Sequence, residues 1–523
     1  TGWVFLGQKR DLWQPAVAEG LQQANQPLTR VERILLLGIV LGAFLLRVVN
    51  LENLFPTPME YGTLLQARRI AESWHELLAP QIYPRGLWLV SLPISLFFRV
   101  FGSELWVGRL SGAIFNTLAI FPLYFIFRKT NRAIALLTAF FYGISPWIVA
   151  LARVVREYAY YPFYDFLVVY AIVRVVENLP GRFLITRDWK ALFEKRNFWS
   201  LVFLMLFPVY ALYVDPQSTF KVVLLSYLAS IWLLTEKFPL NLENWLFLGG
   251  ISMVGLALLW RFSKGISYVE FSLNPRPLTY FFPDPVQQWY FERLAMLLLL
   301  GISLYLVICW RGRTKYAGLA LPAFLFCVHL IPFVFTSIVH HQPRHLLSAQ
   351  IWFVPSAAIG FFLLWKILSA IWGSSRLIST AVLIILMGMT INPGQVLYPV
   401  VTRDADMRIT NLYHDDLSKV HAYLLEHVSP DDILISTAYY AYVSWVGTPS
   451  FRERYRVNLV DKGKQTPKEE ILKIVQHSPS GWMVIDPVGL KLAPYSIPEL
   501  AKEAGMEYIG EMNGEHVWYW KRR

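Results

Sequence analysis

The apolar residues of this chain come in long uninterrupted blocks rather than at the spacing of an amphipathic helix. Most blocks have the roughly 17 to 25 residues that a helix needs to cross a bilayer. The first runs from Val31 to Val49, and the later ones start near Leu87, Trp106, Ala133, Tyr158, Trp199, Thr219, Trp245, Tyr290, Tyr316, Leu346 and Leu377. The pattern therefore predicts a mainly α, polytopic helical membrane protein.

One of these blocks does not fit as a span. Lys9, Arg10 and Arg30 place the amino end in the cytoplasm, and the basic turn 128–132 returns the chain to that side. Only one outward and one inward crossing fit between them. The block from Leu87 to Phe101 is short and contains Pro93, so we expect it to lie in the outer interface. About 11 spans remain.

The charges agree with this topology. Only 16% of the 523 residues are charged, against about 25% in soluble proteins. The net charge of +12 consists of +14 on residues 1–392 and −2 on residues 393–523, and the inner segments hold 18 Lys and Arg against 8 in the outer loops. The positive-inside rule accounts for this excess, so no nucleic-acid partner is expected. The outer loops are 52–86, 152–157, 215–218, 262–289 and 339–345.

The chain divides into three predicted parts. Residues 1–30 form a cytoplasmic amino-terminal segment, and residues 31–392 form the transmembrane domain, whose outer loop 52–105 contains interfacial helices. Residues 393–523 alternate amphipathic helices with short strands and end in an Asn513-Gly514 hairpin. They are expected to form an α/β domain on the outer face.

The first outer loop contains the leading candidate for acid–base chemistry. Met59-Glu60-Tyr61 follows a Pro-Thr-Pro turn at the lipid boundary, where a carboxylate is costly unless it is paired or used. Glu60 suits a base that deprotonates an acceptor, but it also suits an N-terminal cap of the helix that follows. Tyr61 and Arg85 of the same loop are candidate site-lining residues.

The loop 152–157 contributes two cations. Arg153 and Arg156 are three residues apart and would share one helical face, as a forked donor pair for a phosphate. Snorkelling to lipid headgroups is the alternative. Glu157 is a candidate second acid or a partner of these arginines, and Tyr158 is a candidate lining residue.

Two later outer loops add further candidates. Asp215 and Gln217 lie in a very short turn, where they either line a site or cap the next helix. Arg344 and His345 close a histidine-rich cluster, in which Pro343 breaks the spacing that a helical metal site would need. The pair suits an anionic headgroup, and neither a metal nor another cofactor is indicated.

The order of motifs resembles the GT-C superfamily of membrane glycosyltransferases, in the branch of the protein O-mannosyltransferases and the lipid A aminoarabinose transferases. Nearly the whole chain takes part. The matching elements, in order, are Met59-Glu60-Tyr61, Tyr83-Pro84-Arg85, Phe101-Gly102 with Arg109-Leu110, Ser145-Pro146, Arg153 to Tyr158, and Arg344-His345 before Pro355.

The resemblance implies an enzyme that transfers a sugar from a polyprenyl- or dolichyl-phosphate carrier to a hydroxyl or amine of a lipid, glycan or protein acceptor at the outer face. It implies Glu60 as the base or acceptor-positioning carboxylate, and Arg153, Arg156, Arg344 and His345 as ligands of the carrier phosphate. It also implies an integral plasma membrane protein, which we expect to be prokaryotic.

Two departures from the family pattern leave an alternative open. Met59 stands where relatives have Asp, and His345 stands where Tyr is common. Glu157 or Asp215 would have to supply a second acid. The alternative is a non-catalytic scaffold subunit of a larger membrane complex.

Overall fold

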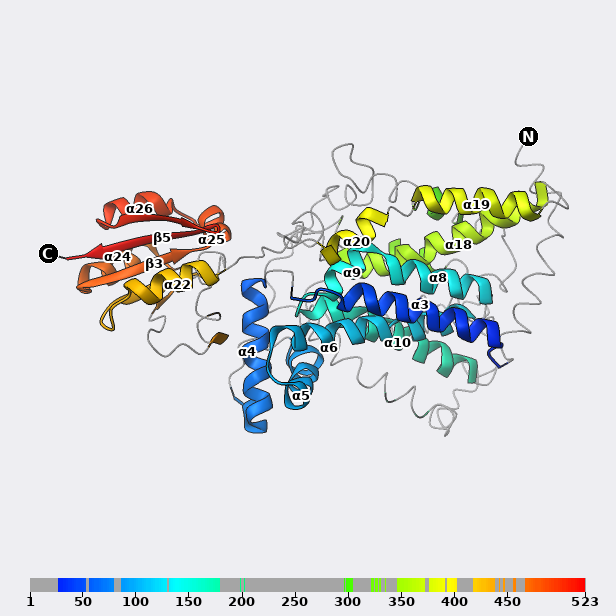
Figure 1. The fold of residues 1–523 in the computed structure, drawn as a ribbon, viewed down its shortest axis with the longest axis horizontal. Coiled ribbons are helices and arrows are strands. Elements are labelled where there is room, and N and C mark those ends of the chain that lie inside the picture. Colours follow the sequence, from blue (N-terminus) through cyan, green and yellow to red (C-terminus); the bar gives the residue numbers. More distant parts are fainter. Residues whose placement is uncertain are drawn as a thin grey trace, which may run out of the picture.

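A computed structural model provides the three-dimensional structure of the chain. It describes residues 27–52, 56–79, 86–128, 131–178, 346–371, 376–390, 393–401, 417–437, 455–457 and 466–522, together with single residues and short helical pieces between 198 and 334 and at 442 and 445–446. The described chain forms a bundle of helices at one end and an α/β unit at the other (Figure 1).

The bundle consists of helices that run roughly along the long axis of the molecule (Figure 1). They are α3 (Arg30–Val48), α6 (Leu105–Leu118), α7 (Ile120–Arg128), α8 (Arg132–Ile144), α9 (Pro146–Ala152), α10 (Glu157–Asn178), α18 (Leu347–Ile371) and α19 (Arg376–Thr390). The first, α3, covers the apolar block from which the first span was predicted.

Two described helical stretches, Leu105–Arg128 and Leu347–Ser369, are long and apolar enough to cross a membrane, and a third qualifies if the bent pair α8 and α9 counts as one. Leu87–Phe101 is a shorter apolar helical stretch, and its interfacial position stays a prediction. The blocks predicted near Trp199, Thr219 and Trp245 lie almost wholly outside the described residues. The total of about 11 spans therefore stays a prediction.

The span predicted from Ala133 is bent by 58° between α8 and α9. Ser145 at the junction is extended, with φ −60° and ψ 116°, because Pro146 has no amide hydrogen and disfavours helical backbone in the residue before it. The break frees carbonyl groups at the end of α8. Arg47, which is fully buried, donates from Nη1 to the Gly143 carbonyl at 2.9 Å and from Nε to Oδ1 of Asn116 at 2.8 Å.

The opposite end of α3 carries a second polar junction. Glu32 lies in the first turn of α3, where Thr29 forms a capping box with it. It accepts hydrogen bonds from Tyr124 and from Nε of Arg128, the latter at 2.9 Å, and it lies 3.7 Å from Nε of Arg132. The predicted inner basic turn is thus tied to the start of the first span.

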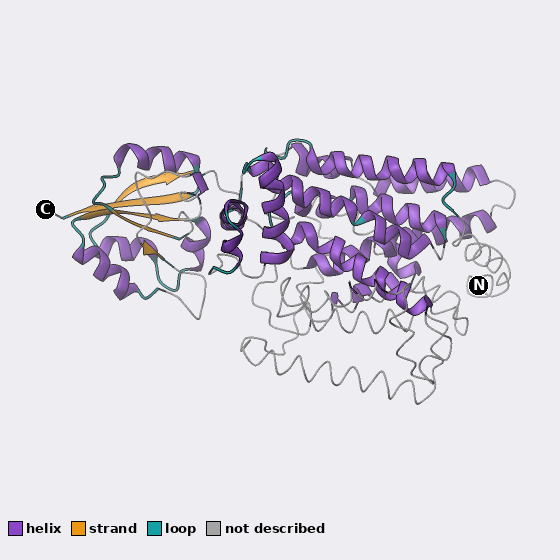
Figure 2. Cartoon of the chain, turned by 90° about the horizontal axis from the view of Figure 1, so that it is seen from below, coloured by secondary structure: helices purple, strands orange, loops and turns teal. Residues whose placement is uncertain are grey.

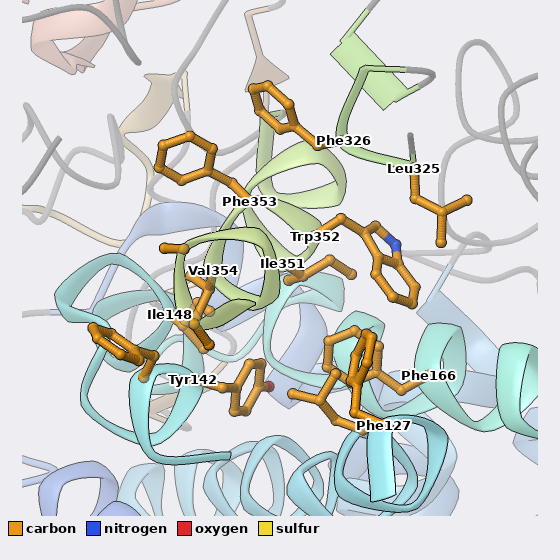
Figure 3. Packing of buried hydrophobic residues seen from close by; sticks show 14 of the residues in the cluster. Phe127, Tyr142, Ile148, Phe166, Leu325, Phe326, Ile351, Trp352, Phe353 and Val354 are labelled. Atoms are coloured by element: carbon orange, nitrogen blue, oxygen red, sulfur yellow. The ribbon is translucent and has the colours of Figure 1, made fainter. Parts of the chain in front are cut away.

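Aromatic rings fill the centre of the bundle. Phe166 of α10 meets Trp352 of α18 and Tyr142 of α8 edge to face, with ring centroids 5.2 and 5.5 Å apart (Figure 3). The indole nitrogen of Trp352 donates to Oδ2 of Asp165 at 3.0 Å. The indole N–H of Trp352 and the carboxylate of Asp165 are therefore hydrogen-bonded to each other, as buried polar groups in a low-dielectric interior must be.

A group of shorter helices crosses the end of the bundle that faces the α/β unit. They are α4 (Pro58–Glu72), the 3₁₀ helix η2 (Trp74–Leu77), the π-helix η4 (Leu87–Ser91) and α5 (Leu92–Phe101). Helix α4 runs across the long axis in Figure 1 and is seen end-on in Figure 2. The interfacial position predicted for the helices of the loop 52–105 stays a prediction.

The α/β unit is built on a five-stranded sheet of order β2-β1-β3-β5-β4. Its strands are β1 (Ile433–Ser436), β2 (Tyr455–Arg456), β3 (Ser480–Ile485), β4 (Glu507–Met512) and β5 (Glu515–Lys521). Strands β2, β1 and β3 are parallel, whereas β5 is antiparallel to both β3 and β4. Asn513 and Gly514 have positive φ in the β4–β5 turn, as an Asn-Gly hairpin requires.

Helices cover both faces of this sheet (Figure 2). They are α22 (Ser418–His427), α24 (Lys468–His477), α25 (Pro487–Leu492) and α26 (Ile497–Glu503). One face packs on Ile471, Val475 and Leu500 of α24 and α26, and the other on Val420 and Leu424 of α22. The helix–strand alternation expected after residue 415 is therefore present, while the side of the membrane on which the unit lies stays a prediction.

The boundary expected at residue 393 falls within the helical part of the structure. Helix α20 (Pro393–Val401) packs against α9 and α3 rather than on the sheet. Nδ2 of Asn50, just after α3, donates to the Val400 carbonyl at 3.3 Å. The short apolar helix stays with the bundle because its buried Val396 and Val400 face other helices.

Candidate active site

Glu60 is the centre of a buried polar cluster where α4 begins. Oε1 accepts from Nε of Arg109 at 3.1 Å and from the backbone amide of Val155 at 2.9 Å. Oε2 accepts from Nη2 of Arg109 at 3.1 Å and from the amide of Thr57 at 2.8 Å. A carboxylate has about four lone-pair positions, so these donors occupy them. In this conformation Glu60 has little capacity left to take a proton from an acceptor.

The Glu60–Arg109 pair joins three segments that are distant in sequence. Glu60 and Arg109 both have 0% side-chain exposure, and Nη1 of Arg109 donates to the Leu51 carbonyl at 2.6 Å. Thr57 caps the first turn of α4 and forms a reciprocal capping box with Glu60. The capping role that the sequence left open for Glu60 is therefore present, together with an ion pair to α6.

Arg153 lies immediately beside this cluster, at the end of α9. Its Nη1 donates to the carbonyl of Val49 at 2.6 Å and also contacts the carbonyls of Leu46 and Arg47. Its Nη2 donates to the carbonyl of Asn50 at 2.7 Å. These carbonyls lie at the carboxyl end of α3, where no amide of the helix is left to donate to them. A cation at a helix carboxyl end is also favoured by the helix dipole.

Arg156 and Glu157 stand in a different environment. Nε of Arg156 lies 3.1 Å from Oε2 of Glu157, and their side chains are 14% and 13% exposed. Glu157 opens α10, where the helix dipole favours a negative charge. The loop that holds them is fixed to Glu60 through the amide of Val155. This arrangement leaves an ion pair at the edge of the buried cluster.

The remaining predicted site residues are divided by the limits of the described chain. Tyr61 is buried in the first turn of α4, and Tyr158 is half-buried against the bundle core. Arg85, Asp215, Gln217, Arg344 and His345 lie outside the described residues, as does the side chain of Met59. The structure thus brings Glu60, Arg153, Arg156 and Glu157 together within one region.

Arg109 is the residue that sequence reasoning did not select for the site. It appeared only as part of the Phe-Gly and Arg-Leu motif. A signal was present, because Arg109 interrupts the apolar block that starts at Trp106, and an arginine in such a block needs a specific partner. Its partner is Glu60, 49 residues earlier in the chain.

The buried charges at this end of the bundle are predominantly positive. Arg47, Arg109 and Arg153 are all completely buried, and Glu60 balances one of them. Arg47 and Arg153 are bonded to backbone carbonyls, which offset charge only partly. An anion at the outer edge of this cluster would be stabilised. Within the described ranges no group of His, Cys, Asp and Glu residues could hold a metal ion.

Comparisons with known proteins give a family match for one segment of the chain. Residues 87–193 match the family described as dolichyl-phosphate-mannose-protein mannosyltransferase. The matched segment contains Arg109, Arg156 and Glu157 but not Glu60. A search of curated proteins returned no match of significance.

Two solved structures share the architecture over most of the chain. One is ArnT from Cupriavidus metallidurans bound to undecaprenyl phosphate, which is 12% identical with a TM-score of 0.50, over 93% of this chain and 97% of that one. The other is the archaeal oligosaccharyltransferase AglB from Archaeoglobus fulgidus in complex with an inhibitory peptide and a dolichol-phosphate. It is also 12% identical with a TM-score of 0.50, over 94% of this chain and 74% of that one.

These likenesses concern the fold of the chain. The chain has the fold of the GT-C membrane glycosyltransferases, and the resemblance indicated by its motifs is confirmed at that level.

Proposed function

We propose that the protein is a glycosyltransferase that moves a sugar from a polyprenyl- or dolichyl-phosphate carrier to an acceptor at the outer face of the plasma membrane. The observation that carries the proposal is the shared fold with ArnT bound to undecaprenyl phosphate, which extends over nearly the full length of both chains. The amino end would lie in the cytoplasm and the α/β unit outside.

The carrier phosphate would bind at the edge of the buried cluster. Arg156 is the described cation best suited to it, because its side chain is partly exposed and its present partner is a neighbouring carboxylate. Arg344 and His345 would complete the phosphate site from the last outer loop. Arg153 would hold the site in shape rather than bind phosphate, since both its terminal nitrogens are bonded to the end of α3.

Glu157 suits the acceptor better than Glu60 does. Both carboxylates belong to the same region, but Glu60 is wholly enclosed and accepts from four donors. Glu157 is partly exposed and pairs with the cation that we assign to the phosphate. It would deprotonate or orient the acceptor while Arg156 stabilises the departing polyprenyl phosphate. Glu60 would position the loop that holds both.

Mass spectrometry of the lipids retained by the purified protein tests the proposal. We expect a polyprenyl-phosphate sugar or the free polyprenyl phosphate, and we expect Arg156→Gln to lose it while Arg69→Gln retains it. Retention of ordinary phospholipids alone, with no binding of added polyprenyl phosphate, would overturn the proposal.

The saturated hydrogen bonding of Glu60 and the presence of Met59 favour one second candidate. A scaffold subunit would keep the Glu60–Arg109 pair for stability and would need no acid at position 59. That reading predicts stoichiometric co-purification with membrane partners and no transfer by the isolated chain.

A further inference from the structure

Helix α4 makes contacts with the α/β unit as well as with the bundle. The guanidinium of Arg68 stacks on the indole of Trp445, 3.8 Å from the ring centroid, and its Nη1 donates to the Trp445 carbonyl at 2.6 Å. Trp445 belongs to the connection between β1 and β2. On its other side the indole lies against Phe98 of α5, with ring centroids 6.1 Å apart.

A second contact involves the residue next to Glu60. The ring of Tyr61 meets that of Tyr442 edge to face, with centroids 5.0 Å apart. Tyr442 in turn meets the ring of His421 on α22 at 5.2 Å. An aromatic chain therefore leads from the first turn of α4 to the helix that covers one face of the sheet.

The buried residues of α4 are divided between two hydrophobic clusters. Tyr61 packs in the sheet cluster with Val420, Trp482 and Val517. Leu64 and Ala67 pack in the cluster formed with α5, α6 and α10. Trp445 is packed against both clusters. The position of α4 is therefore set from two sides.

We propose that Tyr442 and Trp445 are positioning residues, through which the α/β unit holds α4 in place and keeps Glu60 against Arg109. Glu60 and Arg68 are eight residues apart on α4, about 12 Å along its axis, so Trp445 would stop the far part of the helix from tilting. The bidentate ion pair of Glu60 with Arg109 tolerates little displacement of α4, because both hydrogen bonds depend on the relative orientation of the planar carboxylate and guanidinium groups.

The expected effect on activity rests on the proposed function. The link itself, by which Tyr442 and Trp445 hold α4 in place, does not. Loss of the stack would loosen α4 and, through Glu60 and Val155, the loop of Arg156 and Glu157. The chemical groups themselves would remain. We therefore expect a lower kcat and a higher KM for the carrier, since Glu157 would act on the transition state and Arg156 would bind the carrier phosphate.

Hydrogen exchange on the full-length protein in detergent tests the link directly. Trp445→Ala should speed the exchange of the α4 amides about 3- to 30-fold, the range that corresponds to a cation–π stack, while strands β3 and β5 keep their protection. Trp445→Phe retains an aromatic face and should restore most of the protection. Arg69→Ala removes a charge from the next position of α4 and should leave exchange unchanged. Arg68→Gln should reproduce the effect of Trp445→Ala, and the double variant should add little to it.

The outcomes separate the two proposals. Faster α4 exchange in Trp445→Ala, in a protein whose wild type transfers no sugar, would support the link and remove the glycosyltransferase proposal. Normal α4 exchange and normal kcat in both Trp445→Ala and Arg68→Gln would overturn the link and leave the glycosyltransferase proposal standing. If Trp445→Ala also loses protection in β3 and β5, that variant is generally unfolded and Arg68→Gln becomes the deciding variant. Unchanged α4 exchange in Arg68→Gln would then overturn the link.

Discussion

Arg109 meets Glu60 with two nitrogens, one on each carboxylate oxygen, in an ion pair that solvent does not reach. The pair fixes the start of helix α4 to helix α6. Through the amide of Val155 it also holds the loop that leads into α10. Glu60 thus connects α4, α6 and the loop before α10 in the candidate site.

Breaking this pair should destabilise the protein strongly. Arg109→Gln or Glu60→Gln leaves a buried charge without its counter-charge, which typically costs about 3–5 kcal/mol. Thermal unfolding in detergent should show a lower midpoint for each variant. The double variant should lose less than the sum of the two single losses, because no lone charge remains. Additive losses would contradict a direct coupling.

Arg153 and Arg156 should respond differently to the same substitution. Arg153→Gln removes donors from the carbonyls that end α3 and should lower the unfolding midpoint, since each buried acceptor left unsatisfied costs about 1–3 kcal/mol. Arg156→Gln should leave the midpoint nearly unchanged and weaken the binding of polyprenyl phosphate, measured by native mass spectrometry. Equal effects on stability would argue against separate roles.

Arg47 should be essential for the bend between α8 and α9. Arg47→Met deprives Asn116 and the Gly143 carbonyl of their buried donor, so we expect a stability loss of about 2–4 kcal/mol. Arg33→Met provides the control, because Arg33 is an exposed arginine of the same helix. A similar loss in both variants would show that the cost comes from helix composition and not from the bend.

Glu157→Gln should separate catalysis from folding. Loss of a catalytic carboxylate typically lowers kcat about 100-fold or more, while a partly exposed amide in its place should leave the unfolding midpoint within about 0.5 kcal/mol of the wild type. Steady-state transfer assays would measure kcat and KM separately. Undiminished turnover would remove Glu157 from the mechanism.

The α/β unit should lose stability in mild acid. Burial lowers the pKa of His421 below its ordinary value of about 6.5, so the unfolded chain binds a proton more readily than the folded one. Neutral His421 therefore lets the folded α/β unit keep its full stability above pH 6.5. The free energy of unfolding falls as the pH drops below that value. Unfolding monitored by tryptophan fluorescence should show this dependence, and His421→Gln should reduce it.

Much of the helical architecture followed from the sequence, because the length and spacing of apolar blocks reflect the hydrocarbon core and do not depend on distant contacts. Helix α3 and the interfacial Leu87–Phe101 segment were predicted in this way, as was the Asn-Gly turn of the last hairpin. The bend at Ser145 differed from prediction, although Pro146 was visible in the sequence. A proline indicates where a helix is interrupted but does not determine how the two halves pack.

The sequence determined the mainly helical class of fold, and it proposed the residues of the candidate site. Only the tertiary structure decided how each charge is used. Glu60 pairs with Arg109 across 49 residues and Arg153 bonds to carbonyls more than 100 residues earlier, and such partners depend on how the helices pack. Arg153 and Arg156 look alike in the sequence. Arg153 is hydrogen-bonded to carbonyls at the end of α3, whereas Arg156 forms an ion pair with Glu157. The physical reason is burial, which requires every enclosed charge to find a partner, and the available partners depend on how the helices pack.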